Sequence, residues 1–191
     1  MKTLYIERSA VGGRNGAWTG ELDLDGVERI VVGTGPGSFA GIRSAIAFAQ
    51  GYAIGSGCEV LGLPSPCAVA AQVFASAEGG RPCRLAVVGD ARRGMCWIAP
   101  FDGYRMLGDI FQVERERLGN AVADVFGAGS AFSVATPDAA RIDGFLRETF
   151  GESYIGGVTP SPEGLQAFAE KNPSVLTPEP LPIYLNPAVR E

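Results

Sequence analysis

Apolar residues recur along the chain with two spacings, one typical of strands and one typical of helices. Short runs rich in branched apolar residues predict strands at residues 3–7, 28–33 and 58–64. Between the last two runs the apolar positions have helical spacing, at Phe39, Ile42, Ala45, Ile46 and Ala49. Ser38 stands where a hydroxyl can cap free backbone amides, so we expect a helix from Ser38 to Gly51 or Gly55.

The following residues continue the alternation of strands and helices. A helix is expected from Ser65, with Pro66 in its first position, and a hairpin that turns at Gly94. The further expected elements are the two hairpin strands at 85–88 and 95–101, a strand at 109–113, a helix at 114–126, a strand at 131–135 and a helix at 162–171 capped by Ser161. This order predicts a mixed α/β architecture.

Two segments are rich in residues that interrupt regular structure. Residues 11–16 accept positive φ angles and predict a hairpin turn, with residues 17–24 as the returning strand. The C-terminal segment 172–191 contains five prolines, so it can supply only an extended edge segment and no central strand.

Composition narrows the functional classes. The chain has 191 residues, enough for one domain or two small lobes, and 46% of them are hydrophobic. Its formal charge of −5 argues against a direct nucleic-acid ligand. A local basic group is interpreted as solvated hairpin arginines, namely Arg81, Arg84, Arg92 and Arg93.

The chain contains no histidine, which removes the usual base of serine and cysteine hydrolases and most catalytic zinc sites. Its four cysteines have no metal or redox spacing and are expected as reduced thiols. We therefore expect no metal site and no cofactor. No apolar run is long enough to span a membrane and no targeting segment is recognised, so a soluble cytoplasmic protein is expected.

The glycine-rich sequence that opens the first long helix has two interpretations. Backbone amides at Gly33, Gly35, Gly37 and Ser38 stand at a helix N-terminus and could bind an anion or nucleotide. A Walker loop is excluded because Gly41 is followed by Ile and Arg, and the Rossmann pattern matches only in part. Alternatively, the glycines allow two surfaces to approach closely, because the helix that follows is rich in small residues.

Three motifs resemble the TsaB (YeaZ) family of the glycoprotease-like branch. They are "GTGPGSFAGIR" at 33–43, "DARRG" at 90–94 and "PIYL" at 182–185, and the first is the specific one. The resemblance implies an actin/sugar kinase/Hsp70-like (ribonuclease H-like) fold with two lobes. It marks Asp90, Arg92, Gly94 and Tyr184 as family-motif residues.

The resemblance also implies a function. Members act in the biosynthesis of N6-threonylcarbamoyladenosine (t6A) in tRNA as non-catalytic subunits that pair with the catalytic subunit TsaD and with the ATPase TsaE. The resemblance implies no catalytic residue in this chain, only indirect contact with tRNA, and a homodimer when the partner is missing.

The N-terminal part departs from the family pattern. Only 32 residues precede Gly33, and Glu7 and Arg8 stand where the family has Asp and Thr. We therefore expect a reduced N-terminal lobe at 1–83, which contains the glycine loop and the interface helix, and a C-terminal lobe at 84–191.

Three hypotheses follow. The first is a scaffold or activator subunit whose pairing surface comprises Ser38, Phe39, Gly41, Ile42, Ala45, Ile46 and Ala49. The second is a divergent homodimer without the pathway role. The third is a nucleotide-binding or hydrolysing enzyme, or a glycoprotease-like peptidase, for which Asp90 and Glu7 are the candidate carboxylates.

Overall fold

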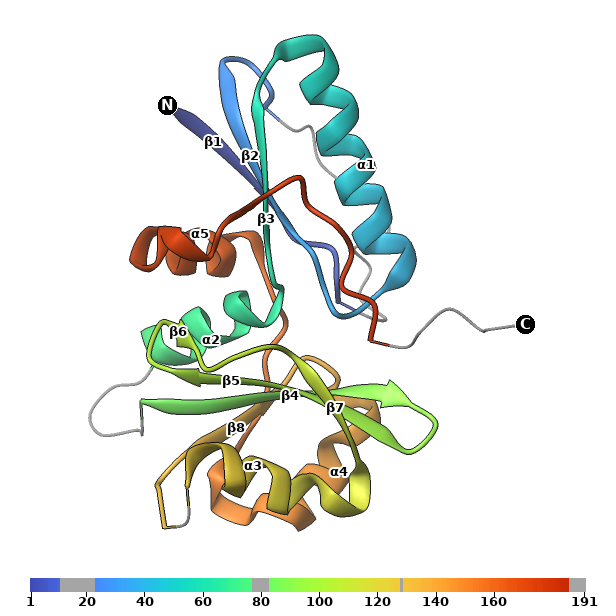
Figure 1. Ribbon diagram of the computed structural model, residues 1–191, viewed down its shortest axis with the longest axis vertical. Coiled ribbons are helices and arrows are strands. Elements are labelled where there is room, and N and C mark those ends of the chain that lie inside the picture. The colour runs from blue at the N-terminus through green and yellow to red at the C-terminus, as the bar shows by residue number, and fades with distance from the viewer. Residues whose placement is uncertain (11–22, 77–82, 128, 186–191) are drawn as a thin grey trace. The chain divides into compact units, whose positions relative to one another are not determined.

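The computed structural model describes residues 1–10, 23–76, 83–127 and 129–185 (Figure 1). These residues form two compact units. Among these residues, unit 1 comprises those within Met1–Ala68 and Pro160–Tyr184, and unit 2 comprises those within Val69–Thr159 and Leu185. Each unit contains its own sheet, so each is described separately.

Unit 1 is built on a four-stranded sheet with the order β1-β2-β3-β10. Strands β1 (Lys2–Ile6), β2 (Val27–Gly33) and β3 (Glu59–Leu63) run parallel, and β10 (Thr177–Pro178) pairs antiparallel with β3. The C-terminal segment is thus an edge element, as its prolines predict. Because β1, β2 and β3 are parallel, the loops that follow them meet at one edge of the sheet.

Two helices cover opposite faces of this sheet (Figure 1). Helix α1 (Phe39–Ser56) packs against alternate residues of the central strand, including Ile30 and Val32, which are fully buried. Helix α5 (Pro162–Lys171) covers the other face, with Leu165 and Phe168 buried. Because successive side chains of a strand point to opposite faces, the part of β2 that both helices cover is apolar at every position, from Ile30 to Val32.

The N-terminal caps of both helices agree with the sequence-based expectations, whereas α1 continues past Gly51 and Gly55, where it was expected to end. The Ser38 hydroxyl oxygen accepts a hydrogen bond from the Gly41 amide, and the Ser161 hydroxyl oxygen accepts one from the Gly164 amide. Helix α1 ends at Gly57, which adopts φ 72°. That left-handed conformation favours glycine and stops the helix at this point.

Unit 2 is built on a sheet with the order β6-β5-β4-β8-β9, and β7 also pairs with β5. Strands β4 (Arg84–Arg92) and β5 (Met95–Asp102) form the predicted hairpin, which turns through Arg92, Arg93 and Gly94, all at positive φ. Strands β4, β8 (Ser133–Thr136) and β9 (Tyr154–Gly157) run parallel. The remaining short strands are β6 (Arg105–Met106) and β7 (Phe111–Glu114).

Helices α3 (Leu118–Phe126) and α4 (Ala139–Phe150) cover one face of the second sheet (Figure 1). Their apolar faces meet Ala86, Val88 and Val134 in a buried core. The 3₁₀ turns at Arg115–Arg117, Gly151–Ser153 and Pro173–Val175 complete the described elements, together with helix α2 (Pro66–Ala75), which spans the boundary between the units.

The structure corrects several details of the sequence-based prediction. The helix expected at 114–126 begins at Leu118 after a 3₁₀ turn, and helix α4 and strand β9 were not predicted. Strand β1 pairs in parallel with β2, whereas the turn at 11–16 lies outside the described residues. The expected division into 1–83 and 84–191 stays a prediction, and the contact-based units have different bounds.

Candidate functional site

The glycine loop lies directly against the segment that follows β1. A Cβ atom at Gly33 would overlap the Glu7 carboxylate, one at Gly37 would overlap Ser9, and one at Gly41 would overlap the Arg8 carbonyl oxygen. Three glycines of the motif therefore accommodate three consecutive residues, 7–9. The geometry favours the close-approach interpretation, and the approaching surface belongs to the same chain.

Most of the loop amides have hydrogen-bond partners within the chain. The Thr34 amide donates to the Leu63 carbonyl at 2.9 Å, and the Ser38 amide donates to the Ser9 carbonyl at 2.7 Å. The Gly35 amide donates to the Ser65 hydroxyl at 3.0 Å, and the Gly35–Pro36 peptide bond is cis. These bonds reduce the number of donors that a phosphate could use. Anion binding at this loop stays a prediction.

Glu7 has a buried carboxylate beside the loop. Its Oε1 accepts a hydrogen bond from the Ser9 amide at 2.6 Å, and its Oε2 is buried without a hydrogen-bond partner among the described residues. Burial raises the pKa of Glu7, and the bond from Ser9 opposes this effect only in part. Burial also raises the pKa of the nearby Cys67 thiol. Burial therefore favours the neutral form of Glu7 more than water does.

Helix α1 has two distinct faces, and the residues of the predicted pairing surface, which stays a prediction, are divided between them. Four of the seven predicted interface residues are at most 5% exposed and pack in the core of unit 1, namely Ile42, Ala45, Ile46 and Ala49. Their side chains cannot contact a partner while unit 1 keeps this core. Gly41 lies under Arg8, and Ser38 caps the helix, so only Phe39 presents a large apolar surface, at 58% exposure.

The opposite face of α1 is exposed, and we call it the accessible face. It consists of Phe39, Ala40, Arg43, Ser44, Ala47, Gln50, Gly51 and Ile54. Small side chains run along its centre, and Phe39 and Ile54 stand near its two ends. Such a surface allows another helix to approach at close range.

The C-terminal segment reaches the first turn of α1. The Ile183 amide donates to the Thr34 carbonyl at 2.9 Å, which places Tyr184 beside the helix. The Arg43 Nε donates to the Tyr184 hydroxyl at 2.6 Å, and the Arg43 guanidinium lies 4.1 Å from the centre of the Phe39 ring. The family-motif residue Tyr184 thus belongs to unit 1, whereas the "DARRG" motif belongs to unit 2.

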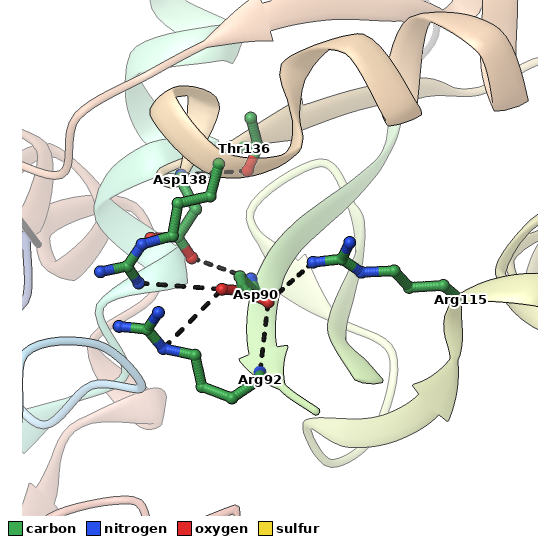
Figure 2. Close-up of polar contacts among 6 residues, drawn as sticks. Asp90, Arg92, Arg115, Thr136 and Asp138 are labelled. Atoms are coloured by element: carbon green, nitrogen blue, oxygen red, sulfur yellow. Dashed lines mark hydrogen bonds and ion pairs between the residues drawn. The ribbon is translucent and has the colours of Figure 1, made fainter. Parts of the chain in front are cut away.

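In unit 2, Asp90 is the centre of an ionic cluster at the end of β4 (Figure 2). Its side chain is 5% exposed, and its Oδ1 accepts hydrogen bonds from Arg115 Nη2 at 3.0 Å and from the Arg92 amide at 3.2 Å. Its Oδ2 lies 3.8 Å from Arg92 Nε and 3.8 Å from Arg141 Nη1. Asp90 therefore holds three arginines from three different segments.

Asp138 completes the cluster. Its Oδ2 accepts a hydrogen bond from the Asp90 amide at 2.9 Å, and its own amide donates to the Thr136 hydroxyl at 3.0 Å (Figure 2). Burial raises the pKa of Asp138, while the hydrogen bond from the Asp90 amide and the positive charge of Arg141 oppose this shift. The carboxylate ties the end of β4 to the start of α4.

Sequence reasoning found Asp90, Arg92 and Gly94 but missed their partners. Gly94 completes the turn at φ 78°, as the motif implies. Arg115, Arg141 and Asp138 come from segments without a recognised motif. The sequence "TPDAAR" at 136–141 has an acidic residue where a strand gives way to a helix, and this was the available signal.

Two kinds of feature, metal-binding side-chain groups and membrane-spanning helices, bear on function. Among residues 1–10, 23–76, 83–127 and 129–185, no group of three or more His, Cys, Asp or Glu side chains could hold a metal ion. Within the same ranges, no helix has both the length and the apolar character needed to cross a bilayer.

One family model and several relatives match this chain. The family described as "TsaD: tRNA N6-adenosine threonylcarbamoyltransferase" matches residues 19–150. Uncharacterized proteins of Mycobacterium tuberculosis and Mycobacterium bovis are 32% identical over 169 residues, which is 86% of this chain. The chain spans 66% of the length of these relatives.

Solved structures show the same fold. YeaZ from Pseudomonas aeruginosa superposes with a TM-score of 0.65 at 23% identity, over 83% of this chain and 74% of that chain. A second P. aeruginosa structure, described as similar to peptidase YeaZ, gives a TM-score of 0.64 at 21% identity, over 84% and 74% of the two chains.

Two glycines of α1 test the close approach of residues 7–9. We expect Gly41→Ala to destabilise unit 1 by about 1–3 kcal/mol, because the new methyl group overlaps the Arg8 carbonyl. Gly51→Ala is the matched control in open space, and it should stabilise the helix by about 0.5–1 kcal/mol. Hydrogen exchange of the β2 amides measures both changes. Equal stabilisation by the two substitutions would contradict the packing described here.

The buried carboxyl of Glu7 predicts a pH effect. Because its pKa is higher in the folded than in the unfolded chain, its contribution to stability is present at low pH. That contribution is lost as the pH rises from about 4.3, the unfolded pKa, through the folded pKa. Glu7→Gln should therefore gain stability relative to the parent chain between pH 4 and pH 8, as measured by urea unfolding. Parallel pH profiles of the two chains would argue against a raised pKa.

Proposed function

The chain belongs to the tRNA N6-adenosine threonylcarbamoyltransferase (TsaD) family as a TsaB (YeaZ)-like member, and we propose that it is a non-catalytic scaffold or activator subunit in t6A biosynthesis. In this proposal it pairs with a TsaD-like catalytic subunit, and a TsaE-like ATPase joins the complex. The chain contacts tRNA only indirectly and works in the cytoplasm, and it forms a homodimer when isolated.

The observation that carries the proposal is the accessible face of α1. The helix is fixed to its own sheet by four buried side chains, yet the other face offers small residues between Phe39 and Ile54, which is 89% exposed. Burial of such apolar surface contributes about 25 cal/mol per Å². A rigid helix with low side-chain bulk is suited to pack against a helix of a second subunit.

The surroundings of the two candidate carboxylates, Asp90 and Glu7, support a subunit that does not itself catalyse a reaction. The Asp90 carboxylate is 5% exposed and already accepts hydrogen bonds from Arg115 and the Arg92 amide. A general base needs to reach a substrate proton directly or through one water molecule. The other candidate carboxylate, Glu7, is covered by the glycine loop. Neither is placed to act on a substrate.

The accessible face gives a direct binding test. We expect the parent chain to bind the catalytic subunit of its own organism at micromolar concentration or below. Ala47→Arg places a long charged side chain at the centre of the face and should weaken binding at least tenfold, about 1.4 kcal/mol. Gln166→Arg adds the same side chain to the exposed surface of α5 and should leave the affinity within twofold.

Titration calorimetry with the purified catalytic subunit measures these affinities. Absence of binding by the parent chain, or equal binding by Ala47→Arg, would rule out pairing through this face. Sedimentation of the isolated chain addresses the alternative of a homodimer without the pathway role. That alternative gains support if the parent chain is a dimer, Ala47→Arg is a monomer, and neither binds the catalytic subunit.

A further inference from the structure

We propose that unit 2 contains a binding site for a phosphate group, formed by the guanidinium groups of Arg92 and Arg141. Arg92 lies in the turn between β4 and β5, and Arg141 lies in the first turn of α4. Its residues belong to unit 2, whereas the glycine loop and the accessible face of α1 belong to unit 1, and the proposal does not depend on the proposed function.

The two guanidinium groups face the same carboxylate oxygen. Arg92 Nε and Arg141 Nη1 each lie 3.8 Å from Asp90 Oδ2, which is an ion-pair distance but too long for a hydrogen bond. The side chains of Arg92 and Arg141 are 62% and 29% exposed, whereas that of Asp90 is 5% exposed. The carboxylate thus positions both arginines from the inside, and each keeps N–H donors for a ligand outside.

The cluster has a surplus of positive charge. Arg115 forms the short bond to Asp90 Oδ1, and Arg92 and Arg141 lie at ion-pair distance from its Oδ2, so three cations stand around the two acidic residues Asp90 and Asp138. Asp138 is the only other acidic residue with a hydrogen bond to the cluster in the described chain, and its pKa is raised by burial. One anion would balance this charge, and forked guanidinium donors match phosphate oxygens in geometry.

The backbone around the cluster has two unfavourable features that an anion would offset. Arg141 is a cation in the first turn of a 12-residue helix that has no acidic residue there, although the helix dipole favours negative charge at this end. The Asp138 side chain does not cap the helix, because it accepts the Asp90 amide instead. The first turn of α4 therefore has no side-chain cap, although the Asp138 carboxyl group stands at its N-cap position.

The second feature is the turn itself. Arg92 and Arg93 have φ angles of 69° and 52°, a conformation that residues other than glycine rarely adopt. Strain of this kind is found where the surrounding structure needs a side chain in one position. Here the turn holds the Arg92 side chain beside Asp90, through the bond from its own amide to Asp90 Oδ1. The charge of the cluster, the start of α4 and the β4–β5 turn thus point to the same two residues, Arg92 and Arg141.

Calorimetric titration of the full chain with inorganic phosphate, ATP and an unmodified tRNA transcript tests the site. We expect Arg92→Gln and Arg141→Gln each to weaken binding about tenfold, because each removes a charged donor. Arg105→Gln is the matched control: it removes the same charge from a side chain that is 71% exposed at the other end of the β4–β5 hairpin. Its affinity should stay within twofold of the parent chain.

Arg92→Lys serves as a further variant, because lysine keeps the positive charge but lacks the forked N–H donors of a guanidinium group. It should bind phosphate more weakly than the parent chain and more tightly than Arg92→Gln. If inorganic phosphate and ATP bind, and the two site variants but not Arg105→Gln weaken this binding, the ligand is a small phosphate compound. Binding of tRNA alone with this pattern identifies the RNA backbone. The proposal is overturned if no probe binds at millimolar concentration, or if Arg92→Gln, whose side chain is largely exposed, binds as the parent chain does.

Discussion

The close contact between the glycine loop and residues 7–9 is the constraint on which unit 1 depends. Strand β1 ends at this contact, β2 leads into the loop, and α1 begins directly after it. Any side chain at Gly33, Gly37 or Gly41 would occupy the space of the neighbouring segment. At Gly37 and Gly41 the backbone of the motif lies against the backbone of Ser9 and Arg8, and at Gly33 it lies against the Glu7 side chain. This packing sets the start and direction of α1.

The position of α1 decides which surface is open to a partner. Its buried stripe completes the core of unit 1, and its accessible face has alanine, serine and glycine, together with Arg43 and Gln50, between two exposed apolar residues. Tyr184 and Arg43 hold the C-terminal segment against the first turn of the helix. Unit 2 shows a different principle, because a buried carboxylate there organises arginines from three segments. The two units thus present an apolar helix face and a basic cluster, respectively.

The sequence predicted the elements whose signals are local. The cap at Ser38, the hairpin at Gly94 and the late helix after Ser161 depend on neighbouring residues and were located correctly. The two faces of α1 were not separable, because alanine occurs both in the core, at Ala45 and Ala49, and on the surface, at Ala47. The meeting of Arg115 and Arg141 at Asp90 depends on tertiary structure and has no local signal.

A double-mutant cycle between Glu7 and Gly33 measures the central contact most directly. A methyl group at Gly33 would overlap the Glu7 carboxylate, so Gly33→Ala should destabilise the parent chain. In the Glu7→Ala background the obstructing side chain is gone, and the cost of Gly33→Ala should fall by at least about 1 kcal/mol. Urea unfolding of the four chains provides the coupling free energy. Additive effects of the two substitutions would show that the Glu7 side chain does not pack on Gly33 as described.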